Sequence, residues 1–122
     1  MADEQPDPVI DVHDYEGVRV SCTRQRWTDR IEANHPELQQ RASEVADAIQ
    51  NPELVFEDRD YPNRKHHLVR TPDNPYGSLL ATIVEYGYDT ESGVTIGRIV
   101  TAFYKTRIRD DDTPLFISLS HS

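Results

Sequence analysis

Apolar and polar residues alternate in two short runs near the N-terminus. Residues 8–13 (PVIDVH) and 18–23 (VRVSCT) place apolar side chains at alternate positions, which is the period of a half-buried strand. Between them lies the segment Asp14-Tyr15-Glu16-Gly17, in which Gly17 is free to adopt a positive φ. We therefore expect an N-terminal β-hairpin.

After this hairpin the apolar period becomes helical. Thr28 is a candidate N-cap for a short helix that ends at Asn34, because a residue that precedes a proline, here His35, is disfavoured in the α region. Pro36 suits the first turn of a second helix, which ends before the Asn51-Pro52 pair. The apolar positions of this second helix share one face: Leu38, Ala42, Val45, Ala46 and Ile49.

Four further runs, rich in β-branched, aromatic and other apolar residues, follow the helices. They cover residues 54–57, 65–70, 78–86 and 95–104, and turn-forming Pro, Asn, Asp and Gly residues separate them. Such short links favour an antiparallel meander. Because the helices precede the strands instead of alternating with them, we predict an α+β fold, with the hairpin and two helices packed on one face of a four-stranded antiparallel sheet.

The chain has 122 residues, which is the size of one domain. We assign residues 8–109 to that domain, residues 1–7 to a disordered acidic tail and residues 110–122 to a C-terminal acidic and polar tail. No apolar run is long enough to cross a membrane, so no membrane partner is expected. A single cysteine cannot form an internal disulfide, and we expect a reducing, cytoplasmic compartment.

The charges are unevenly distributed along the chain. The formal net charge is -9, from 13 Lys and Arg against 22 Asp and Glu, which argues against a nucleic-acid partner. However, residues 1–16 and 110–112 contain nine carboxylates, so the segment between them is neutral overall. All but one of the basic residues fall in three windows, at 19–30, 59–70 and 98–109. Local positive charge is therefore available for recognition.

His35 is the first candidate for chemistry. A proline fixes it between two predicted helices, and an imidazole exchanges protons near neutral pH, as a general acid or base must. The alternative is that His35 only caps the second helix or fills a gap.

The strand at 64–70 carries a second candidate group. Its adjacent histidines, His66 and His67, point to opposite faces and cannot reach one metal ion, so we expect neither a metal nor a cofactor. Lys65 and His67 share one face, and Arg64 and Arg70 the other. The alternative is an ordinary solvated strand edge.

A basic and aromatic stripe leaves the end of the last strand. It consists of Tyr104, Lys105 and Arg107, a combination that suits an RNA backbone and an unstacked base.

The order of three separated motifs resembles a known family. They are Trp27-Thr28-Asp29-Arg30-Ile31 with Asn34-His35-Pro36-Glu37, then Asn51-Pro52-Glu53, then Ile99-Val100-Thr101-Ala102-Phe103-Tyr104. Over residues 9–105 the chain resembles the phage-encoded branch of the barnase, EndoU, colicin and RelE-like (BECR-fold) nucleases. The resemblance implies a helical part on a four-stranded sheet and metal-independent RNA cleavage by 2′-hydroxyl attack. It also implies a toxin or phage effector that acts on transfer RNA or ribosome-associated messenger RNA, with a cognate antitoxin or immunity protein as a partner.

The resemblance assigns roles to individual residues. His35 matches the family histidine and is the expected general acid or base, and the hydroxyl of Thr101 is expected to contact the scissile phosphate. A second acid–base group falls on Lys65 or His67, while Arg30, Arg64 or Arg70 binds the RNA and supplies the charge that stabilises the phosphate.

The chain departs from the family at two positions. Arg30 replaces a common histidine, and Asn34 replaces a common arginine. Two alternatives to the endoribonuclease therefore stay open: a catalytically weakened module that binds RNA or protein, and an acidic antitoxin or immunity protein.

Overall fold

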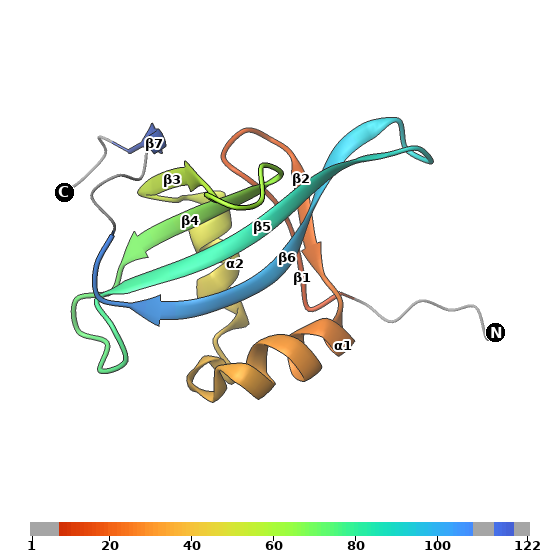
Figure 1. Cartoon of the computed structure of the whole chain (residues 1–122). Helices are drawn as coiled ribbons and strands as arrows, with labels where there is room; N and C mark the ends of the chain where they lie inside the picture. The colour runs from red at the N-terminus through yellow and green to blue at the C-terminus, as the bar shows by residue number, and fades with distance from the viewer. Residues whose placement is uncertain (1–7, 109–113, 119–122) are drawn as a thin grey trace.

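In the computed structural model, which describes residues 8–108 and 114–118, one seven-stranded sheet forms the body of the protein (Figure 1). The order across the sheet is β1-β2-β6-β5-β4-β3-β7. The strands are β1 (Ile10–His13), β2 (Arg19–Cys22), β3 (Leu54–Glu57), β4 (Arg64–Arg70), β5 (Leu79–Asp89), β6 (Val94–Lys105) and β7 (Pro114–Ile117).

The N-terminal hairpin is present, but the prediction that it packs on one face of the sheet is wrong. β1 and β2 are antiparallel, and Gly17 in their connection has a φ of 84°. β2 then pairs in parallel with β6, opposite Gly97 and Arg98. Gly97 permits this approach, because a Cβ there would lie 2.9 Å from a methyl group of Val20. The hairpin therefore extends the sheet and does not pack on its face.

The helical segment differs from the expected pair of helices. Thr23, not Thr28, is the N-cap, and its hydroxyl accepts the Arg26 N–H at 3.1 Å. The helix α1 (Arg24–Arg26) continues as the π-helical turn η1 (Trp27–Glu32). The second predicted helix is divided, because Gln40 adopts a φ of 64° after the 3₁₀ turn η2 (Pro36–Leu38). The helix α2 (Ala42–Gln50) follows.

The predicted fold must be corrected from a four-stranded to a seven-stranded sheet with short helices. β3, β4, β5 and β6 pair antiparallel in chain order, but β2 joins the edge at β6 and β7 joins the edge at β3. β7 lies in the segment expected to be a C-terminal tail, whereas residues 1–7 lie outside the described residues. The physical reason is that β3 and β6 would otherwise expose unpaired backbone groups, and local alternation does not indicate which distant segment will pair with them.

The sheet has two unlike faces. On one face α2 and η1 cover a core that includes Ile31, Ile49, Val84 and Ile99. In Figure 1 α2 lies behind the sheet, and no helix of the described residues lies in front of it. We call the front the helix-free face; its apolar cluster is Phe56, Leu68 and Ala81, with Leu54, Leu79, Phe103 and Ile108 packed against it. Within the described residues, no helix is both long and apolar enough to cross a membrane.

Candidate functional site

Strand register brings polar and aromatic side chains together on the helix-free face. His66 of β4 is opposite Ile83 of β5, which is opposite Thr101 of β6. Because side chains on a strand alternate, Thr101, Phe103 and Lys105 point to this same face. All three are partly exposed. The face therefore presents a hydroxyl, an aromatic ring and an ammonium group along one strand.

His35 lies at the margin of this face, between η1 and η2. Its backbone N–H donates to the carbonyl of Ile31 at 2.8 Å, and its own carbonyl accepts the N–H of Leu38 at 2.9 Å. Ile31 and Leu38 are fully buried, so they fix the histidine between them. The His35 ring is 5.7 Å from the Phe103 ring, centroid to centroid, and its side chain is 31% exposed. The imidazole is therefore both anchored and accessible.

His66, which sequence reasoning left out of the site, also belongs to the helix-free face. Its Nε2 is 2.8 Å from Oδ2 of Asp58, and its ring stacks on Phe56 at 4.8 Å. Its Nδ1 is buried, and none of the described residues hydrogen-bonds to it. With one nitrogen bound and the other buried, His66 is better placed to order this region than to meet a substrate. The sequence alternation separated His66 from His67, but it carried no signal for which face would be covered.

A polar cavity of about 250 Å³ adjoins His66. Asp58, Arg59 and Lys105 line it, and the Lys105 ammonium lies 5.7 Å from the centre of the Phe56 ring. Burial alone would raise the pKa of Asp58, but the hydrogen bonds from His66 and from backbone N–H groups outweigh it and lower that pKa. The carboxylate thus stays ionised beside the imidazole.

His67 and Lys65 lie on the opposite face and are not brought together with His35 and Thr101. His67 is fully buried, and burial lowers its pKa to about 4. Its Nε2 is 3.2 Å from the hydroxyl of Tyr86, which donates to Asp14 at 2.6 Å. Lys65 contacts the carboxylate of Glu16 at 3.5 Å. These groups tie the turn between β1 and β2 to the sheet.

The predicted RNA-binding residues are dispersed. Arg30 is exposed on η1, and Arg107 is exposed beyond the end of β6. Tyr104 is only 8% exposed, and its hydroxyl donates to Glu44 of α2 on the helix-covered face. Arg70 is held by the carboxylate of Glu53. Of the cations proposed for binding, Arg64, Arg70 and Lys105 lie on the helix-free face, and Arg70 is engaged there by Glu53.

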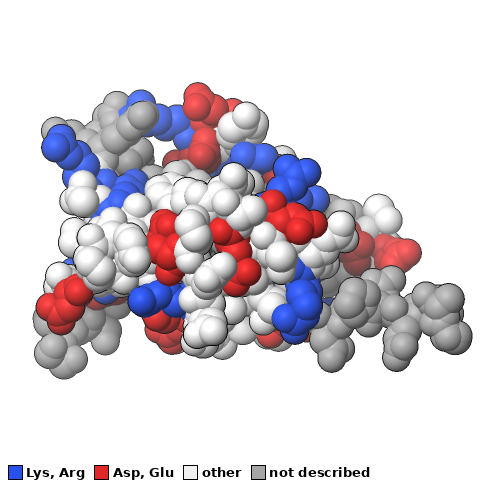
Figure 2. Space-filling model, turned by 90° about the horizontal axis from the view of Figure 1, so that it is seen from below, with Lys and Arg blue, Asp and Glu red and all other residues white. Residues whose placement is uncertain are grey.

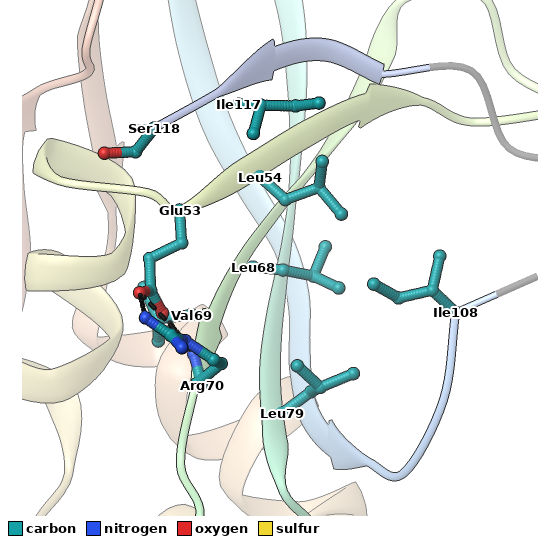
Figure 3. Close-up of a pocket in the computed structure, with 9 residues that line it drawn as sticks. All are labelled: Glu53, Leu54, Leu68, Val69, Arg70, Leu79, Ile108, Ile117 and Ser118. Carbon is teal, nitrogen blue, oxygen red and sulfur yellow. Dashed lines mark hydrogen bonds and ion pairs between the residues drawn. The ribbon is translucent and has the colours of Figure 1, made fainter. Parts of the chain in front are cut away.

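The ion pair of Arg70 and Glu53 borders an apolar groove on the same face (Figure 3). Leu54, Leu68 and Leu79 point into it from three strands, Ile117 of β7 lies beside Leu54, and Ile108 faces the leucines from the segment after β6. Figure 2 shows the surface on the side where α1 lies, and there basic and acidic side chains are interspersed instead of forming one patch. The three basic windows of the sequence therefore do not make one broad cationic surface on that side.

Comparison with protein-family models, with curated proteins and with solved structures finds no match to this chain. Within residues 8–108 and 114–118, no group of three or more His, Cys, Asp or Glu side chains has the arrangement of a metal site. The candidate site consequently rests on the geometry of His35, Thr101, Phe103 and Lys105.

Proposed function

We propose that this protein is an endoribonuclease that cleaves RNA on the helix-free face of its sheet. The observation that carries the proposal is the contact of the anchored His35 ring with Phe103, on the strand that also presents Thr101 and Lys105. An accessible imidazole, a hydroxyl and an ammonium group are the groups that phosphodiester cleavage uses. The resemblance of the sequence motifs to BECR-fold nucleases supports the same chemistry.

In the proposed reaction His35 acts as the general base. It removes the proton of a ribose 2′-hydroxyl, and the 2′ oxygen forms a bond to the adjacent phosphorus. The bond from phosphorus to the 5′ oxygen breaks, and that oxygen takes a proton from water. The products are a 2′,3′-cyclic phosphate and a 5′-hydroxyl. Thr101 stabilises the charge that develops on the oxygens of the reacting phosphate, Lys105 supplies positive charge further along the same strand, and Phe103 stacks on a neighbouring base.

The residues that the sequence suggested as a second acid–base group, His67 and Lys65, have no part in the proposed reaction. His67 is buried on the other side of the sheet, and Lys65 is engaged with Glu16 there. Lys105 therefore takes the place of these two residues as the positive group next to the substrate.

Incubation with total transfer RNA in the presence of EDTA tests the proposal. We expect products that end in 2′,3′-cyclic phosphate and 5′-hydroxyl groups, and a loss of about 100-fold or more in His35→Ala. The matched control is His13→Ala, because His13 is an exposed histidine on β1, away from the candidate site. Equal cleavage by His35→Ala and His13→Ala, or no cyclic ends with the unmodified protein, contradicts the proposal. RNA binding without cleavage would identify the weakened binding module instead.

A further inference from the structure

Two arginines from different strands meet at one carboxylate beside the candidate site. Glu85 of β5 lies opposite Arg64 of β4 and opposite Arg98 of β6. Its Oε1 accepts from Nη2 of Arg98 at 2.6 Å, and its Oε2 is 3.4 Å from Nε of Arg64. Since Glu85 is two residues from Ile83, which lies opposite Thr101, all three charged groups are on the helix-free face.

The cluster carries a net positive charge at the surface. The hydrogen bond from Arg98 is the main cause that lowers the pKa of Glu85, so the carboxylate is ionised. One carboxylate between two guanidinium groups leaves one positive charge. The Arg98 side chain is 59% exposed, and a guanidinium has five N–H donors, more than one carboxylate can use. The cluster can therefore accept an anion without losing its own ion pairs.

An exposed aromatic ring adjoins the cluster. The Arg64 guanidinium lies 4.0 Å from the centre of the Tyr61 ring, and Tyr61 is 52% exposed. A ring paired with a guanidinium in this way can stack on a base that has left a duplex. The cluster thus offers both a phosphate contact and a base contact.

The position of the cluster relates it to the candidate reaction. Same-face neighbours on a strand, such as Glu85 and Ile83, are separated by about 7 Å. Consecutive phosphates of an extended single strand have a similar separation. A strand whose scissile phosphate lies at Thr101 would consequently bring a neighbouring phosphate to Arg98.

We infer that Arg64 and Arg98, held by Glu85, form a second phosphate subsite, and that the substrate is unpaired RNA. This inference rests on the proposed function, and it names the class of substrate for the same face. Paired bases would not be free to stack on Tyr61 and Phe103. Glu85 offsets one of the two positive charges, so its carboxylate weakens the attraction of the subsite for phosphate.

Binding of an RNA that cannot be cleaved tests the subsite without relying on catalysis. The probe is a fluorescent 2′-O-methyl oligouridylate of about twelve nucleotides, long enough to contact several cations, with anisotropy measured over a range of salt concentrations. In Arg98→Gln the slope of log affinity against log salt should fall by about 0.7, the value for one phosphate contact on a single strand. The matched control is Arg19→Gln, because the Arg19 side chain is about as exposed as that of Arg98 and is also paired with a carboxylate, but it lies on β2 and its partner Asp11 lies on β1.

Glu85→Gln gives an independent result that misfolding does not mimic. Removal of this negative charge should tighten binding of the same probe about twofold to fivefold, the usual range for one exposed charge pair. A duplex of the same length should bind more weakly than the single strand.

An unchanged salt slope in Arg98→Gln, or weaker binding in Glu85→Gln, overturns the subsite. Equal binding of duplex and single strand overturns the assignment to unpaired RNA. If these binding results hold but transfer RNA is not cleaved, only the proposed catalysis fails. If the slope of log affinity against log salt fell equally in Arg19→Gln, the effect would be nonspecific charge, and the subsite would be contradicted.

Discussion

The buried imidazole of His67 should make the stability of this protein fall as the pH decreases. Burial lowers the pKa of His67 from 6.5 to about 4, and the nearby positive charges of Lys65 and His66 act in the same direction. The carboxylate of Asp14 opposes this shift but does not cancel it. Below pH 6.5 the unfolded chain therefore binds a proton that the native protein excludes until about pH 4. The native state holds fewer protons in this window, so acid favours unfolding.

The size of the effect follows from the two pKa values. A difference of one pKa unit corresponds to about 1.4 kcal/mol. Between the unfolded pKa of 6.5 and the native pKa of about 4, the free energy of unfolding should thus fall by about 3 kcal/mol because of His67 alone. Above the unfolded pKa the contribution is constant, since both states hold a neutral ring.

Urea denaturation of the unmodified protein and of His67→Gln, at several values from about pH 7.5 to about pH 4, isolates this contribution. Carboxylates titrate in both proteins, so the difference between the two free energies of unfolding reports His67. That difference should shrink by about 3 kcal/mol over the range. A constant difference for His67→Gln would refute the reasoning. If that variant does not fold, NMR titration of the native protein tests the same prediction. A His67 resonance that titrates near the ordinary pKa of histidine would then refute the reasoning.

Two further substitutions test the packing of the sheet. Tyr86→Phe removes the donor to the buried carboxylate of Asp14 and should lower the free energy of unfolding by about 1.5–3 kcal/mol, against about 0.5 kcal/mol or less for Tyr88→Phe at an exposed position. Equal urea midpoints for these two variants would contradict the role of the hydrogen bond. Gly97→Ala places a Cβ within 3.0 Å of valine methyl groups on β5 and β2 and should cost about 1–3 kcal/mol, whereas Gly87→Ala meets no atom within 4 Å and should be nearly neutral. Equal thermal midpoints would show that β2 and β6 are not held together by this close contact.

Local sequence signals located most of the strands but not their partners. Alternation and turn residues predicted strands close to the observed β1 to β6, because both signals depend on neighbouring residues. β7 is only four residues long, and nothing within Pro114–Ile117 indicates that it will pair with β3. The pairing of β2 with β6 similarly joins segments that are far apart in the chain.

In the candidate site, too, local sequence signals identified individual residues but not their distant neighbours. The sequence singled out His35 by its position before Pro36, and Thr101 and Lys105 lie on one face of their strand, as the alternation requires. The preference for His67 over His66 was not supported by the observed arrangement, because a period of two separates two faces without identifying which one is covered. The turn between β1 and β2 covers the face of His67, and that turn is remote in sequence from β4.

The sequence by itself determined which segments become β1 to β6 and the helix α2, and where Gly17 and Pro36 change the direction of the chain. The tertiary structure alone decided that the sheet has seven strands, that His35 meets Phe103, and that Arg64 and Arg98 share Glu85. Periodicity and turn chemistry act through bonds and near neighbours, so they can be read from a single chain. The pairing of edge strands, the burial of side chains and the ion pairs between strands all join segments that are distant in the sequence. Several segments can pair with the same backbone groups or cover the same apolar surface, so the outcome depends on the folding of the whole chain.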